Sequence, residues 1–113
     1  MSQSIEITSS NFQSEVAESD VPVLIDMWAA WCGPCRMVSP IVDELAGDYA
    51  GRIKVGKIDV DAEPAIAQAF GVASIPTIVL IKDGEVVAQA IGARPKAQLA
   101  QALRLDEFAA AAA

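Results

Sequence analysis

The sequence predicts an α/β domain in which four helices cover both faces of a central, mixed, five-stranded sheet. Apolar runs of strand length alternate with segments of helical periodicity, which is typical of parallel strands joined by crossover helices. The last two strand-like runs are separated only by Lys82-Asp83-Gly84, and Asp-Gly in this position predicts an antiparallel hairpin. The chain has 113 residues, enough for one domain with its own core. The expected order is β-α-β-α-β-α-β-β-α.

The first helix and the first central strand have clear local signals. Residues 10–18 are expected to form a helix, because Ser10 and Gln13 fit a capping box at its start. Val21–Trp28 is an almost continuous apolar run. Such a run predicts a strand that is buried on both faces.

A long helix and a second central strand follow. Residues 36–49 carry apolar side chains at helical spacing. Pro40 lies inside this pattern and is expected to kink the helix, because proline removes one backbone donor. Ile53–Val60 is apolar or alternating and predicts the next strand.

The second half of the chain predicts a short helix, a hairpin and a last helix. Asp61 is the candidate cap of the short helix over residues 61–71. The hairpin strands are Thr77–Ile81 and Glu85–Ile91, and residues 95–108 show the periodicity of one final helix.

One domain over residues 1–108 accounts for all these elements. Residues 109–113 are all alanine. This tail either extends the last helix or is a remnant of cloning.

Composition excludes several kinds of function. The net charge is −7 with only eight Lys and Arg, which argues against nucleic acid as a partner and favours a dispersed monomer. No apolar run is long enough to span a membrane. The first twenty residues contain no Lys or Arg and no long apolar block, so no secretory signal is expected. With Met1 as the native start, these features predict a protein of the reducing cytoplasm, where a structural disulfide would not persist.

The two cysteines lie together in Trp31-Cys32-Gly33-Pro34-Cys35. Such a pair could bind a metal, exchange electrons as a dithiol and disulfide, or be inert. A metal site is not expected, because four ligands are usual and the chain has no histidine and no other cysteine. Two ordinary buried cysteines would not call for Gly-Pro between them. Redox activity is therefore the favoured interpretation.

The position of the motif gives the two thiols different roles. It joins a predicted strand to a predicted helix, and Pro34 suits a first helical turn. Cys32 then lies at the helix N-terminus, where free N–H groups and the helix dipole lower the pKa of its thiol. Cys35 lies one turn further and is expected to be more buried and less ionised. We therefore expect Cys32 to attack and Cys35 to resolve.

Asp26 interrupts a strand that is otherwise apolar. A buried carboxyl group tends to have a raised pKa, and Asp26 precedes Cys32 by only six residues. It is a candidate proton acceptor for Cys35, directly or through a water molecule; the alternative is an acid at an edge or in a solvated loop. Lys57, in the next strand, is either its ion-pair partner or a surface lysine.

Ile75-Pro76-Thr77 opens the first hairpin strand, where proline is tolerated. Composition does not assign a cis or a trans bond before Pro76, since cis bonds are only about 5–6% of X-Pro bonds.

Taken together, these motifs resemble the thioredoxin family over almost the whole chain. The resemblance is carried by the following residues: Asp26, the run Trp28–Arg36, Pro40, Lys57, Asp59, Ile75-Pro76-Thr77, Asp83-Gly84 and Ile91-Gly92. It implies the thioredoxin fold and a protein-disulfide reductase that works through a mixed disulfide. It also implies a cis Pro76 facing the cysteines, with Asp26 and Lys57 assisting proton transfer.

The resemblance further implies how the protein binds its partners. No cofactor is expected on the chain itself; NADPH and FAD would act only through a thioredoxin reductase that restores the dithiol. The flat surface that docks disulfide-containing proteins would comprise these residues: Trp31, Gly33, Pro34, Ile75, Pro76, Gly92 and Ala93. Gly33 and Pro34, with Pro76, would also tune the redox pair.

Two alternatives remain at this point. A thiol oxidase or disulfide isomerase would use the same chemistry, but such relatives usually carry a histidine before the second cysteine, and this chain has none. A binding module would use the apolar face around Trp31 and Ile75 without redox turnover.

Overall fold

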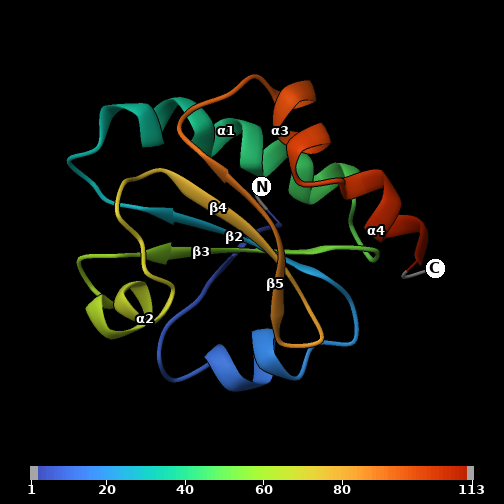
Figure 1. Cartoon of the computed structure of the whole chain (residues 1–113), viewed down its shortest axis with the longest axis horizontal. Helices are drawn as coiled ribbons and strands as arrows, with labels where there is room; N and C mark the ends of the chain where they lie inside the picture. The colour runs from blue at the N-terminus through green and yellow to red at the C-terminus, as the bar shows by residue number, and fades with distance from the viewer. Residues whose placement is uncertain (1–2, 112–113) are drawn as a thin grey trace.

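The structure is a computed structural model that describes residues 3–111. Its centre is a five-stranded sheet with the strand order β1-β3-β2-β4-β5 (Figure 1). The strands are β1 (Ile5–Glu6), β2 (Val23–Trp28), β3 (Lys54–Asp59), β4 (Thr77–Lys82) and β5 (Glu85–Ile91). β3 is parallel to β1 and β2, whereas β4 is antiparallel to both β2 and β5. The predicted mixed sheet is confirmed.

Helices cover both faces of this sheet, as predicted (Figure 1). One face carries α1 (Gly33–Asp48), α3 (Lys96–Ala102) and α4 (Leu105–Ala111). The other carries α2 (Pro64–Ala69) and a single π-helical turn, η1 (Gln13–Ala17). α1 continues without interruption through Pro40. Among the described residues, no helix is both long and apolar enough to cross a membrane.

The alternation of β2 divides the core into two layers. Leu24 packs in the layer under α1, α3 and α4, whereas its neighbour Ile25 packs in the layer on the side of α2 and η1. Val55 of β3 and Ile78 of β4 belong to the same layer as Leu24. β2 is therefore buried on both faces, which explains its almost continuous apolar sequence.

The hairpin between β4 and β5 has the turn that its sequence predicts. Asp83 and Gly84 both adopt positive φ angles, 53° and 80°. Two positive φ angles in a two-residue turn match the twist of the strands, and Asp-Gly is well suited to them. The positive φ of Gly84 costs no steric energy because glycine lacks a Cβ atom.

The prediction of one final helix over residues 95–108 is wrong in detail. The segment is broken at Arg104, which has a φ of 53°, and α4 begins at the next residue. The break turns Leu105 and Ala109 into the core, where both are fully buried. It also lets the Tyr49 hydroxyl donate a hydrogen bond to Asp106. α4 runs through the first tail alanines, whereas Ala112 and Ala113 lie outside the described residues.

The two predicted side-chain caps are also wrong. Ser10 shares a hydrogen bond with the Thr8 hydroxyl, and no side chain caps η1. Asp61 does not cap α2, whose N-cap position is Glu63. In both cases the side chain that the local pattern assigned to a helix end forms a hydrogen bond elsewhere: Ser10 with Thr8, and Asp61 with Trp31.

Candidate active site

The two cysteines lie at the junction between β2 and α1. β2 ends at Trp28, and α1 begins at Gly33 with Cys32 as its N-cap residue in an extended conformation. Pro34 lies in the first turn of α1, which is the position that proline favours. The strand-to-helix placement predicted from the sequence is confirmed.

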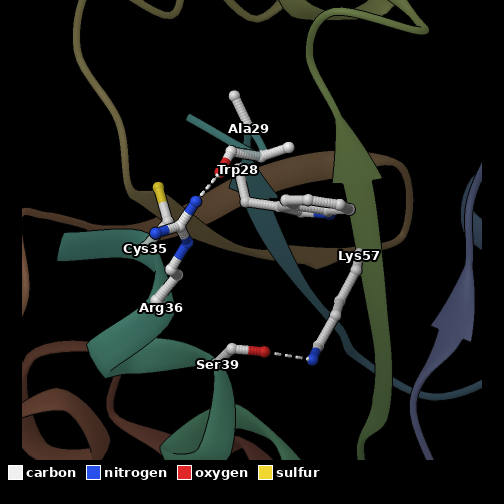
Figure 2. Close-up of a pocket in the computed structure, with 7 residues that line it drawn as sticks. Trp28, Ala29, Cys35, Arg36, Ser39 and Lys57 are labelled. Atoms are coloured by element: carbon white, nitrogen blue, oxygen red, sulfur yellow. Dashed lines mark hydrogen bonds between the residues drawn. The ribbon is translucent and has the colours of Figure 1, made fainter. Parts of the chain in front are cut away.

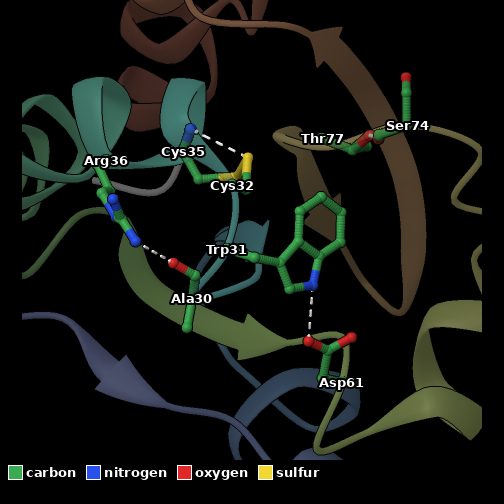
Figure 3. Close-up of a disulfide and its surroundings, with 8 residues drawn as sticks. All are labelled: Ala30, Trp31, Cys32, Cys35, Arg36, Asp61, Ser74 and Thr77. Carbon is green, nitrogen blue, oxygen red and sulfur yellow. Dashed lines mark hydrogen bonds between the residues drawn. A yellow bond between two sulfur atoms is a disulfide. The ribbon is translucent and has the colours of Figure 1, made fainter.

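Cys32 and Cys35 are joined in a disulfide, so the structure is the oxidised form (Figure 3). Their Cα atoms are 5.3 Å apart. The Cys35 backbone N–H donates to the Cys32 sulfur at 3.2 Å. An N–H group in this place stabilises negative charge on sulfur, and therefore favours the Cys32 thiolate once the bond is reduced.

Exposure does not distinguish the two cysteines. Cys32 is 4% exposed and Cys35 is 3% exposed, so both are buried to nearly the same extent in this oxidised form. That the Cys35 thiol is the more buried of the two stays a prediction for the reduced form. What differs is their position on α1. Cys32 precedes α1, and its sulfur accepts a hydrogen bond from the Cys35 N–H group. Cys35 itself lies inside the first turn of the helix.

Trp31 stands beside the disulfide with its ring in solvent (Figure 3). It is 69% exposed, yet its indole N–H donates to Asp61 Oδ2 at 2.9 Å. Asp59 in turn accepts a hydrogen bond from the Asp61 backbone. Asp61, which follows β3, thus holds the exposed Trp31 ring in place. No local pattern indicates this role of Asp61, because Trp31 and Asp61 are far apart in the chain.

The loop before β4 faces the disulfide. The Ile75–Pro76 bond is cis, as the family resemblance implied. Ile75 packs against the buried cluster that contains both cysteines. The Pro76 carbonyl accepts a hydrogen bond from Gly92 N–H at 2.9 Å, which ties this loop to the end of β5. Ala93 follows Gly92 in the chain and is exposed.

A hollow of about 640 Å³ opens between Trp31 and α2. Its lining includes Val60, Ala67, Val72 and Ile75. The hollow is mainly apolar and lies beside the disulfide. It can receive an apolar side chain of a polypeptide that approaches Cys32.

Asp26 is buried, as predicted. It is 1% exposed, and neither carboxyl oxygen has a hydrogen-bond partner among the described residues. Burial raises the pKa of Asp26 to about 6; the positive charge of Lys57 opposes this rise, and the negative charge of Asp43 adds to it. The carboxyl group therefore changes its protonation state close to neutral pH.

Lys57 does not form an ion pair with Asp26. The two residues are direct neighbours in the parallel register of β2 and β3. The Lys57 ammonium nevertheless points to α1, where it donates to Ser39 Oγ at 2.7 Å (Figure 2). It also meets Asp43 Oδ1 at 2.9 Å. Of the two alternatives for Lys57, the ion pair with Asp26 is not formed, because α1 presents a hydroxyl and a carboxylate to the same ammonium group.

Cys35 and Lys57 line a common hollow of about 540 Å³ between α1 and β3 (Figure 2). Trp28, Arg36 and Ser39 also line it. The Arg36 guanidinium closes one side by donating to the Ala30 carbonyl. The hollow thus lies against the Cys35 side of the disulfide.

These features define a class of protein: an α/β domain that exchanges thiols and disulfides. Among the described residues, no group of three or more His, Cys, Asp or Glu side chains is placed to hold a metal ion. The redox chemistry belongs to the cysteine pair at the start of α1.

Comparison with known proteins identifies the family. A sequence model described as Thioredoxin matches residues 3–105. "Thioredoxin 1" from Nostoc sp. is 52% identical over 103 residues, which cover 91% of this chain and 96% of that protein. "Thioredoxin" from Haemophilus influenzae is 52% identical over 100 residues, covering 88% and 94%. "Thioredoxin" from Pyropia yezoensis is 52% identical over 98 residues, covering 87% and 92%.

The chain belongs to the thioredoxin family. It is a thiol-disulfide oxidoreductase with disulfide-reductase function, and its redox centre is the Cys32–Cys35 disulfide, without a bound cofactor.

Proposed function

We propose that the protein reduces disulfides in other proteins, with Cys32 as the attacking and Cys35 as the resolving residue. The Cys32 thiolate attacks one sulfur of the target disulfide, and the other target sulfur leaves as a thiolate that takes a proton from water. Cys35 then loses its proton and attacks Cys32, which releases the second target sulfur as a thiolate. Two electrons pass to the target, and the Cys32–Cys35 disulfide remains.

The hydrogen bond from Cys35 N–H to the Cys32 sulfur is the observation that carries this assignment. It favours negative charge on Cys32, which is the N-cap residue of α1. Gly33 and Pro34 contribute by starting the helix directly after Cys32, and both are exposed.

Asp26 accepts the proton that Cys35 loses in the second step. Its pKa of about 6 leaves it mostly ionised at neutral pH, yet far more basic than an ordinary aspartate. Lys57 acts by its charge rather than by direct contact, because its ammonium lies against α1. The hollow that Cys35 and Lys57 share gives room for a water molecule in the proton path.

Target proteins dock on the surface around Trp31, Ile75, Pro76, Gly92 and Ala93. Trp31 and Ile75 flank the apolar hollow, which suits one side chain of an extended target segment. The backbone groups of Ile75 are available to pair with such a segment, while Gly92 holds the Pro76 carbonyl in place.

The oxidised protein is restored by a thioredoxin reductase that draws on NADPH through its own FAD. The chain acts as a monomeric electron carrier in the cytoplasm, and residues 1–108 form its single domain. The acidic net charge of −7 supports a dispersed monomer.

Trapping the intermediate tests this function. Reduced Cys35→Ser protein, mixed with a protein that contains one disulfide, should accumulate a mixed disulfide that is visible by mass spectrometry without reductant. Cys32→Ser should trap far less. Equal trapping by the two variants would contradict the assignment of roles.

The alternative of a binding module requires a different result. A Cys32→Ser, Cys35→Ser double variant should lose all ability to support growth that depends on this protein. Full activity of that variant would show that the surface around Trp31 works without redox turnover.

A further inference from the structure

We propose that Ser39 and Asp43 are positioning residues for the proton step: they hold the Lys57 ammonium against α1 and so keep it from pairing with Asp26. This proposal rests on the proposed function, because it concerns the proton acceptor of the resolving step. Neither residue touches the reacting sulfurs in the contacts described, and both act through Lys57.

The side chains of Asp26, Lys57 and Asp43 lie in one layer, between the sheet and α1. Leu24 of β2 and Val55 of β3 both pack on the side of α1. Residues two positions further along each strand point the same way, so Asp26 and Lys57 share this side. Asp43 lies on α1, which covers that face.

Two carboxylates, those of Asp26 and Asp43, therefore compete for the Lys57 ammonium. In the structure it meets Asp43 Oδ1 at 2.9 Å, and it donates to Ser39 Oγ at 2.7 Å. Ser39 and Asp43 are four residues apart on α1, so they lie on one face of the helix. The Asp26 carboxyl group receives no hydrogen bond from any described residue, although Lys57 is its neighbour in register.

Lys57 pairs with Asp43 and not with Asp26 because Asp43 is less buried. The Asp43 side chain is 36% exposed and the Lys57 side chain 20%, whereas Asp26 is almost completely buried. An ionised Asp43 thus keeps part of its hydration, and the Ser4 hydroxyl also donates to it. Pairing Lys57 with Asp26 instead would require both charges to leave water.

The arrangement sets how strongly Asp26 holds a proton. The charged groups that act on Asp26 are Lys57 from β3 and Asp43 from α1, while β4 presents the apolar Ile78 beside it. Lys57 lowers the pKa of Asp26 and Asp43 raises it. A direct ion pair would make Asp26 a weaker base. With Lys57 held on α1, the carboxylate stays basic enough to take the proton of Cys35.

A carbon-13 NMR titration of the Asp26 carboxyl group in the oxidised protein tests the proposal directly. Asp43→Asn should lower the titration midpoint, since Lys57 is released toward Asp26 and one negative charge is lost. Ser39→Ala changes no charge and should also lower the midpoint, by a smaller amount. Asp43→Glu should restore the original midpoint.

A double-variant cycle separates positioning from the simple loss of the Asp43 charge. Lys57→Met alone should raise the midpoint of Asp26. In the Lys57→Met background, Ser39→Ala should have no effect, and Asp43→Asn should have a clearly smaller effect than in the parent protein. Additive shifts, or no shift with Ser39→Ala in the parent protein, would overturn the proposal.

The kinetic readout is the pH profile of mixed-disulfide resolution. Its acidic limb should move to lower pH in Asp43→Asn, following the titration midpoint; a limb that stays in place while the midpoint moves would contradict a role in the proton step. The NMR titration does not depend on turnover. If Cys35→Ser failed to trap a mixed disulfide, the proposed function would fail, whereas the positioning of Lys57 would be judged by the titration alone.

Discussion

A single buried acid, Asp26, sets the pH dependence of stability that we expect for this fold. Its pKa rises from 3.8 to about 6 on folding. An acid whose pKa is raised by folding is penalised only when it is ionised. The cost is therefore absent below about pH 4, grows as pH rises, and is complete above about pH 6. About two pKa units correspond to about 3 kcal/mol.

Asp26→Ala should remove this penalty. The free energy of unfolding of the variant, relative to the parent protein, should increase by about 3 kcal/mol between about pH 4 and pH 8. The cavity left by the side chain has a cost that does not depend on pH, so it cancels in this comparison. Urea unfolding at several pH values measures the difference.

Asp20→Ala is the matched control, because Asp20 is an exposed acid in the loop before β2. Its relative stability should stay constant over the same pH range. A flat profile for Asp26→Ala as well would mean that Asp26 is not penalised by burial.

Residue roles were predictable from the sequence where they depend on near neighbours. The place of Cys32 at a helix start follows from the strand before it and from Pro34 after it. The burial of Asp26 follows from its apolar flanks. The partner of Lys57 did not follow, because it depends on which face of α1 packs over β3.

Individual elements show how strongly a turn can depend on one residue. Gly84 has a φ of 80°, and Gly47 lies inside α1 without a neighbour within 4 Å of an added Cβ atom. Both positions have room for a methyl group. They differ in backbone conformation alone, which makes them a matched pair.

Gly84→Ala should destabilise the protein by about 1 kcal/mol, because an L-residue is strained at positive φ. Gly47→Ala should stabilise it by about 0.5–1 kcal/mol, because alanine is a better helix former than glycine and Gly47 lies in the last turn of α1. Thermal or urea unfolding of both variants measures the two signs. Equal effects of the two substitutions would argue against the described turn.

The features that could not be predicted from the sequence are those determined by packing. The break at Arg104 serves the burial of Leu105 and Ala109, and helical periodicity continues across it. The Asp-Gly turn, in contrast, was predictable because its conformation is a local property of two residues.

At the scale of the whole molecule, the sheet positions a redox pair that needs no cofactor. β2 carries Asp26 and leads into the cysteines, β3 carries Lys57, and β4 begins directly after the cis Pro76. The strand and helix order was predictable from alternating patterns. The convergence of the Pro76 loop, Trp31 and Gly92 came from the resemblance to a family, since no local pattern relates residues so far apart.

The reduction potential of the Cys32–Cys35 pair tests the central claim most directly. The protein would be equilibrated with defined ratios of reduced and oxidised dithiothreitol, and the free thiols counted after alkylation. We expect a midpoint below the cytosolic glutathione poise, which is roughly −220 to −260 mV by extraction. The dithiol would then donate electrons to protein disulfides. A midpoint well above this range would contradict the reductase function and favour a thiol oxidase or isomerase.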